Sequence, residues 1–456
     1  MKTNLLIRGI CLIAVVLSIS GCKEEYDKVI DKTIYANKSS LALYYGDKEQ
    51  VTVSPVEEGY SWISDNTEVA TVSADGLIEA VGVGITDVIV SKNGLSKYIP
   101  VTVSIPTFDR VIGRPGNKRV ALELVITNDK IKTVKITRLD NNESQTQEVN
   151  YQSGTIIIYY NNLEEGNYPF KVVCIDRFDN ESTPFELSVR AYGDAYQSTL
   201  VNRQINVVSK FGNGMAATWT NNVGNFIEFF YTDENGQPAS KVVPVNAQSS
   251  HVVDFDSGPV SYKTLYLPEP ASVDTFRLAQ VSYTGTINDY TTYIRSSPAV
   301  TIVKPGDFDL GGEGVGFHDS DSNHSGAAGA NYRKDRGDTR SDPCDIEAVA
   351  GNIGTINTGE WMIYTLIVLD EGDYEIDWYI SVNNSAGSTC HVEIDGVSSA
   401  VYQMPNQSNW SAWRYHCEAN GATPPEFHLT PGKHKLLFYA NSSGFNFNGM
   451  KVTYKP

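Results

Sequence analysis

The chain has 456 residues, a formal net charge of −18 and 41% hydrophobic residues. This length is enough for about three to four domains of ~100–150 residues each, and the apolar content is sufficient for ordinary hydrophobic cores. Lys and Arg form no cluster. This argues against nucleic acid, heparin-like chains and anionic lipid surfaces as partners, since all of these bind preferentially to basic patches. A neutral ligand, or no ligand, fits this composition better.

The amino terminus has a basic start and then an apolar run over residues 10–19. An apolar stretch this short is typical of a signal-peptide core and is too short to span a membrane. The small residues directly before Cys22 resemble the bacterial lipobox, in which the cysteine thiol carries diacylglycerol. The resemblance implies a lipoprotein signal peptide over residues 1–21, a lipidated Cys22 and a linker over residues 22–32.

The segment Lys23-Glu24-Glu25 follows that cysteine. It resembles the acidic surface-export signal of Bacteroidetes lipoproteins, which implies a protein anchored by lipid in the outer membrane and facing the cell exterior. The start of an ordinary solvated linker explains the same charges equally well.

Six cysteines are present, one of them within the signal peptide. Once Cys22 is lipidated, the remaining thiols are those of Cys174, Cys344, Cys390 and Cys417. The exported compartment permits disulfides. The last three cysteines lie in the final domain, so at most one bridge can form within it, and the pairing stays open.

Helical periodicity is nearly absent along the chain. Short runs of alternating or β-branched residues, such as residues 50–53 and 155–160, recur between Gly, Asn, Asp and Pro turns. This pattern predicts an all-β fold. We expect tandem immunoglobulin-like and fibronectin-like sandwiches, followed by a jelly-roll β-sandwich.

Residues 33–104 form the first expected domain. Its motifs are Ser61-Trp62-Ile63-Ser64-Asp65, Val69-Ala70-Thr71-Val72-Ser73, Asp75-Gly76-Leu77-Ile78 and Gly82-Val83-Gly84-Ile85-Thr86. They resemble the bacterial immunoglobulin-like domain of group 2, whose members usually serve as spacers or adhesion modules. We expect Trp62 to belong to the core and Asp75-Gly76 to make a tight turn.

Residues 105–196 and 197–302 are predicted to be two further sandwiches. The stretch from Asn162 to Tyr196 resembles a Bacteroidetes domain family of unknown function, built like fibronectin type III repeats. Tyr168 stands where a tyrosine corner is expected. The aromatic run at residues 226–231 is interpreted as one buried strand with alternating faces.

From about residue 303 the composition shifts to Gly, Asn, Ser and aromatic residues. The motifs include Asp307-Phe308-Asp309, Gly311-Gly312-Glu313-Gly314, Gly351-Asn352-Ile353-Gly354, Gly359-Glu360-Trp361, Asn409-Trp410, Gly432-Lys433-His434 and Asn446-Phe447-Asn448. In this order they resemble a family 6 carbohydrate-binding module, a lectin-like jelly roll. The resemblance covers residues 303–456 and implies a neutral glycan ligand.

The family's loop-end sugar site consists of two aromatic residues and an asparagine. The resemblance places Trp410 as one aromatic and Asn446 as the amide, whereas Thr355 stands where the second ring is expected. The sugar would then rest on one ring beside a hydroxyl instead of between two rings. This substitution either alters the ligand preference of the site or abolishes binding there. Trp361 occupies the position of a second site on a sheet face, but we expect it more often to be core.

Members of the family often hold a structural calcium ion near the start of the module. This chain has Lys304-Pro305-Gly306-Asp307 there. With only one acid in that stretch, a calcium ion is doubtful and we expect no cofactor. His318, Asp319 and His324 are interpreted as ordinary loop residues, although a metal site among them stays open.

No catalytic motif such as G-x-S-x-G, H-E-x-x-H or a P-loop is present, so we expect a non-enzymatic protein. Two hypotheses remain. The first is a surface lipoprotein that captures polysaccharide or oligosaccharide for an outer-membrane importer within a polysaccharide utilisation system. The second is an adhesin or structural stalk that binds host glycoprotein or another protein.

Overall fold

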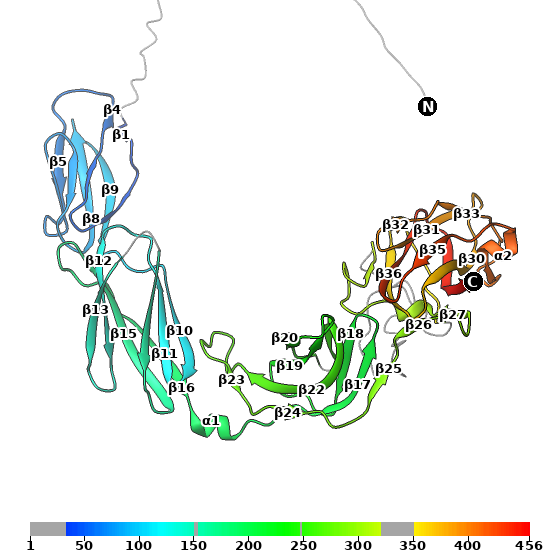
Figure 1. Cartoon of the computed structure of the whole chain (residues 1–456). Coiled ribbons are helices and arrows are strands. Elements are labelled where there is room, and N and C mark those ends of the chain that lie inside the picture. The colour runs from blue at the N-terminus through cyan, green and yellow to red at the C-terminus, as the bar shows by residue number, and fades with distance from the viewer. Residues whose placement is uncertain (1–32, 150–153, 247–248, 321–350) are drawn as a thin grey trace, which may run out of the picture.

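The computed structural model describes residues 33–149, 154–246, 249–320 and 351–456. Four β-units follow one another along an open arc (Figure 1), and the all-β prediction is confirmed. Within the described residues no helix is long or apolar enough to cross a membrane. The predicted signal peptide, Cys22, the linker and Cys344 lie outside the described part of the chain.

The first unit consists of a four-stranded sheet in the order β2-β9-β8-β5, a three-stranded sheet β3-β7-β6 and the pair β1-β4. Its strands are β1 Tyr35–Ala36, β2 Leu41–Tyr44, β3 Lys48–Gln50, β4 Val53–Ser54, β5 Ser61–Ser64, β6 Ala70–Val72, β7 Leu77–Ala80, β8 Gly84–Lys92 and β9 Leu95–Ser104. Trp62 is half-buried against the core. The tight turn forms as predicted, because Gly76 has a φ of +86° and its N–H donates to the Ser73 carbonyl over 3.0 Å.

The second unit is a seven-stranded arrangement in the order β13-β12-β15-β16-β10-β11-β14. Its elements are β10 Arg110–Asn117, β11 Arg119–Val125, β12 Ile131–Arg138, β13 Ser144–Glu148, β14 Thr155–Asn161, β15 Gly166–Asp176, β16 Phe185–Tyr192 and α1 Asp194–Ser198. The Tyr168 hydroxyl donates to the Glu164 carbonyl over 2.8 Å. A tyrosine hydroxyl bonded to backbone a few residues upstream is the feature of a tyrosine corner, so that prediction is confirmed.

The third unit packs the sheet β21-β18-β17-β25 against the sheet β20-β19-β22-β23. Its strands are β17 Ile205–Phe211, β18 Gly214–Trp219, β19 Phe226–Asp233, β20 Pro238–Pro244, β21 Ser249–Val253, β22 Phe255–Tyr266, β23 Phe276–Arg277, β24 Val281–Ser282 and β25 Ile287–Asp289. In β19 the side chains of Ile227, Phe229 and Tyr231 are buried, while their neighbours are half-buried. The aromatic run is therefore a strand with one face in the core, as predicted.

The terminal unit is a sandwich of two sheets, ordered β26-β29-β36-β31-β32 and β27-β37-β30-β34. Its elements are β26 Thr292–Ile294, β27 Val300–Val303, η1 Pro305–Asp307, β28 Phe317–His318, β29 Trp361–Val368, β30 Gly372–Val382, β31 Ser388–Ile394, β32 Val397–Ser398, β33 Tyr402–Met404, β34 Arg414–Tyr415, α2 His416–Asn420, β35 Glu426–Leu429, β36 Gly432–Ala440 and β37 Phe445–Lys455. Strands β26 and β27 pair with β29 and β37. The predicted boundary at residue 303 is therefore about eleven residues too late, because both strands complete sheets of the terminal unit.

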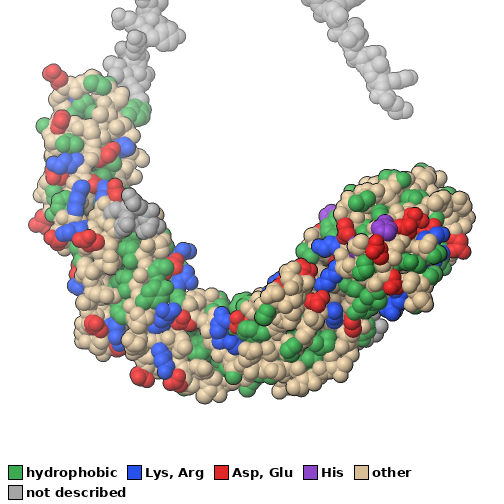
Figure 2. Space-filling model, in the orientation of Figure 1, with side chains coloured by type: hydrophobic (Ala, Val, Ile, Leu, Met, Phe, Trp, Pro, Cys, Tyr) green, Lys and Arg blue, Asp and Glu red, His purple; other side chains and the backbone are tan. Residues whose placement is uncertain are grey.

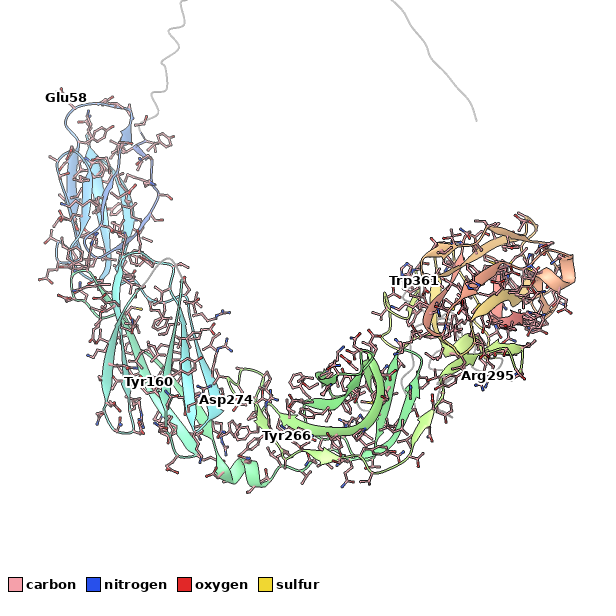
Figure 3. The ribbon with its side chains drawn as sticks, in the orientation of Figure 1. Glu58, Tyr160, Tyr266, Asp274, Arg295 and Trp361 are labelled. Carbon is pink, nitrogen blue, oxygen red and sulfur yellow. The ribbon has the colours of Figure 1, made fainter. Side chains whose placement is uncertain are left out.

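Direct contacts join the units along the arc. The Arg119 guanidinium of the second unit pairs with Asp274 of the third through Nε and Oδ2 at 2.8 Å, and Figure 3 shows Asp274 at this junction. Lys433 of the terminal unit lies 3.3 Å from Asp256 of the third.

The thiols of Cys174, Cys390 and Cys417 are free and buried, so no disulfide joins the cysteines that the structure describes. Burial raises the pKa of the Cys390 and Cys417 thiols well above the ordinary value. These thiols are therefore neutral packing groups of the terminal core.

Candidate glycan-binding site

The loop-end residues predicted from the sequence converge at the carboxyl end of β30. Ser381 in β30 pairs in register with Asn446 in β37. The Ser381 hydroxyl also donates to the Asn409 carbonyl over 2.7 Å, which ties the loop carrying Trp410 to the same point. Trp410 and Asn446 are 36 positions apart in sequence, and these contacts bring the backbone of the Trp410 loop to the strand position of Asn446, whose side chain is buried.

Trp410 is the exposed member of this site, with 45% of its surface accessible. The Asn409 carboxamide oxygen accepts a 2.8 Å bond from the Ser411 N–H, and the Gln407 N–H donates to the Val382 carbonyl over 2.9 Å. These bonds shape the loop on both sides of the tryptophan. An exposed indole held in a bonded loop loses little conformational entropy when a ligand binds.

Thr355 reaches the same end of the sandwich through a two-way backbone bridge between Ile353 and Phe447, the neighbour of Asn446. Its side chain is exposed, and its φ of +50° lies in the left-handed region. A β-branched residue seldom adopts this conformation, which costs about 1–3 kcal/mol. Strain of this kind is concentrated at functional sites, and here the strained residue replaces the expected ring.

Three aromatic residues beside this site were missed in the sequence. Trp413 stacks on Tyr379 with ring centroids 5.8 Å apart, and Tyr379 lies 4.8 Å from Tyr415. All three rings are half-buried, on the outward-facing positions of β30 and the segment that pairs with it. They form a half-buried aromatic cluster on the same sheet. No local pattern signals them, because the contact needs segments more than 30 residues apart.

The short helix α2 anchors the segment that follows. Asp377 is buried, and its carboxylate accepts bonds from the Cys417 and Glu418 N–H groups over 2.8 and 3.1 Å. The imidazole of His416 stacks on Trp378 with centroids 5.4 Å apart and an interplanar angle of 10°. Burial lowers the pKa of His416 below its ordinary value, a shift that Asp377 opposes.

This histidine predicts a pH dependence of stability. Because the pKa of His416 is depressed in the folded state, the unfolded state binds the proton more readily. The contribution of neutral His416 to folding stability is therefore present above about pH 6.5 and is lost as the pH falls through the folded pKa. The terminal unit should melt at a lower temperature at pH 5.5 than at pH 7.5 in thermal scans. His416→Phe keeps an aromatic ring on Trp378 and should reduce this difference. An unchanged difference in the variant would exclude His416 as its source.

Trp361 lies on the outer face of its sheet, and the expectation that it is core was wrong. It is half-buried, while Met362 and Tyr364 fill the interior. In Figure 3 it lies on the side of the terminal unit that faces the hollow of the arc. Strand β29 does bury one face, as predicted, but the buried face carries Met362 and Tyr364 and not Trp361.

Trp361 belongs to a cross-strand row of four ring-bearing side chains. His318 pairs with Trp361, Trp361 with Tyr439, and Tyr439 with His391. The imidazole of His318 lies 6.1 Å from the Trp361 ring, and that of His391 lies 4.9 Å from Tyr439. Such a row offers flat apolar faces with polar edges, the combination that binds a pyranose ring.

At the start of the terminal unit, Pro305 and Gly306 are buried and have no side-chain oxygen. A calcium ion there would have to use backbone carbonyls and the Asp307 carboxylate. Among the residues that the structure describes, no group of three or more His, Cys, Asp or Glu side chains could hold a metal. His318 instead contacts Glu313, with Nδ1 and Oε1 2.5 Å apart, and His324 lies outside the described residues.

Comparison by sequence profile matches residues 102–276 to DUF4998, a domain of unknown function. The match spans the second unit and most of the third. It agrees with the predicted resemblance of this region to a domain family of unknown function, and its description assigns no activity. The search among curated proteins gave no significant match.

Several solved carbohydrate-binding modules are similar to part of the chain. The C-terminal family 6 module of LamC, a laminarinase from Zobellia galactanivorans, is 17% identical over 34% of this chain and 98% of its own, with a TM-score of 0.23. A family 6 module of Cellvibrio mixtus lichenase 5A, solved with cellotriose, is 21% identical over 23% of this chain and 78% of its own, with a TM-score of 0.20. A family 35 module from Clostridium thermocellum is 12% identical over 34% of this chain and 98% of its own, with a TM-score of 0.24.

Proposed function

We propose that the protein is a non-catalytic, cell-surface lipoprotein that binds a neutral polysaccharide or oligosaccharide through its terminal unit. The observation that carries the proposal is the exposed Trp410, whose loop is tied through Asn409 to Ser381, the register partner of Asn446. An aromatic face packs on the C–H side of a sugar ring, and an amide fixes its hydroxyls. The Trp361 row supplies a second surface of the same chemistry.

The charge distribution supports a neutral ligand. Figure 2 shows acidic and basic side chains interspersed over the visible face of the terminal unit, without an extended basic patch. The chain as a whole carries a formal net charge of −18. A strongly anionic polysaccharide would be repelled by this surplus and would find no basic groove to offset it.

The position of the sites supports a capture role. In this proposal the lipid on Cys22 fixes the amino end to the outer membrane, and the first three units carry the terminal unit away from it. Polysaccharide held there would be delivered to a neighbouring outer-membrane importer of a polysaccharide utilisation system. The arc in Figure 1, with the terminal unit at its far end, suits such a presentation.

Affinity electrophoresis tests the proposal. The chain with Cys22→Ser, which removes the lipid, is run through native gels containing soluble β-glucan, xylan, galactomannan or glycogen. We expect retardation by at least one of these neutral polysaccharides and none by the anionic control alginate. Free migration in every gel, together with capture of a protein from host extracts, would instead favour the adhesin.

A further inference from the structure

A pocket of about 360 Å³ lies where the third and terminal units meet. Its volume is in the range of small-molecule sites. Its lining comes from both units: Asn213, Glu234, Val253 and Asp254 from the third, and Asp309, Val315, Ile363, Thr365, Asp395, Lys433 and Lys435 from the terminal unit. Neither unit would form this pocket by itself.

The pocket continues the ring-bearing row of the terminal sheet. Trp361 and Ile363 are alternate residues of β29 and share its outer face, and Ile363 lines the pocket. Alternate residues of a strand are about 7 Å apart. The next outward pair along the sheet is Thr365 with Lys435, both in the pocket. Trp361 and the pocket therefore lie along the same outward face of β29, with the buried Thr365 at the far side of the pocket.

The wall contributed by the third unit is held in place. The Asn213 carboxamide donates to the Leu310 carbonyl over 2.8 Å and accepts from the Leu310 N–H over 2.9 Å. The Asp254 carboxylate accepts a 2.8 Å bond from the Tyr231 hydroxyl. With Lys433 paired to Asp256 across the same junction, the pocket is pre-formed, which lowers the entropic cost of binding.

Two polar groups in the pocket are uncommitted. Within the described residues, no hydrogen bond or ion pair is formed by the Glu234 carboxylate or the Lys435 ammonium, although both line the pocket. A carboxylate accepts hydrogen bonds from sugar hydroxyls, and an ammonium donates to them. The lining also includes the apolar side chains of Val253, Val315 and Ile363. With four carboxylates against two lysines, the lining disfavours an acidic sugar.

The geometry points to a composite glycan site, in which one neutral sugar residue of the bound chain occupies this pocket and contacts Glu234 of the third unit and Lys435 of the terminal unit. This inference rests on the proposed glycan binding. The third unit then takes part in recognition, and the ligand binds along its chain instead of only at an end.

Calorimetric titration of the Cys22→Ser chain tests the composite site, with the soluble β-glucan, xylan, galactomannan and glycogen of the gel panel as titrants. Glu234→Gln and Lys435→Met should each weaken binding of the glycan about ten-fold, since the first replaces a charged acceptor by a neutral one and the second removes a charged donor. The double variant should show coupling, because both groups contact the same sugar. Asn235→Ala is the matched control: it is exposed at the tip of the same hairpin, outside the pocket.

The outcomes separate the two proposals. If both pocket variants bind as tightly as the parent chain while Trp361→Ala and Trp410→Ala bind more weakly, the composite pocket is wrong and glycan binding stands. If the parent chain binds none of the polysaccharides, both proposals are overturned. Glu234 and Lys435 are exposed, so unchanged melting temperatures should show that the variants are folded.

Discussion

Replacing Trp410 with alanine should weaken the binding of a neutral polysaccharide about 30-fold, equivalent to about 2 kcal/mol. The indole is the most exposed aromatic ring at the loop-end site, and its loss removes the apolar platform for the sugar. The Asn446 amide would remain. A lone hydrogen-bonding group, however, exchanges a bond to water for a bond to sugar and adds little net binding free energy. Isothermal titration with the polysaccharide that retards the chain in gels measures the change.

Tyr98→Ala is the control for this variant. Tyr98 is an exposed aromatic residue of similar accessibility, at 56%, on β9 of the first unit. The Tyr98→Ala chain should bind the polysaccharide with the affinity of the parent chain. Equal affinity of the Trp410 variant and the control would show that the loop-end site does not contact the ligand. A loss in Trp361→Ala alone would then place recognition on the other sheet.

Replacing Trp378 with alanine should destabilise the terminal unit by about 3–5 kcal/mol. This side chain is fully buried, stacks on His416 and meets Tyr402 edge to face with centroids 5.0 Å apart. Its removal leaves a cavity between β30 and α2. Differential scanning calorimetry should show the transition of the terminal unit lowered by roughly 10 °C.

The surface variant Val397→Ala, in the same unit and 64% exposed, should change stability by less than about 0.5 kcal/mol. A Trp378→Ala chain with the parent's melting profile would contradict the packing described for the core. The two tryptophan variants also separate stability from recognition. Trp378→Ala lowers the melting temperature, whereas Trp410→Ala lowers affinity in a chain that melts normally.

Features set by local chemistry were predictable from the sequence. The strand pattern indicated the all-β fold, the Asp75-Gly76 pair predicted a turn, and Tyr168 predicted a corner. Each depends on residues within about five positions of one another, where backbone preference and side-chain alternation are sufficient. A loop-end site with Trp410 and Asn446 was predicted only through the resemblance to a family, and it stays a prediction.

The unpredicted features depend on contacts between distant segments. Periodicity shows that β29 has a buried and an exposed face but does not say which face carries Trp361. The boundary before β26 was missed because this strand follows the third unit closely and pairs with a strand about 70 residues later. The left-handed Thr355 and the pocket at the unit junction have no sequence signature at all.

A glycan array probed with the Cys22→Ser chain tests most directly whether the terminal unit binds neutral glycans. The array carries neutral and acidic glycans and is probed in parallel with Trp410→Ala and Trp361→Ala. We expect signals confined to neutral glycans of related linkage, strongly reduced for Trp410→Ala. No bound glycan, or binding that is the same for the parent chain, Trp410→Ala and Trp361→Ala, would contradict glycan recognition by the two proposed surfaces of the terminal unit.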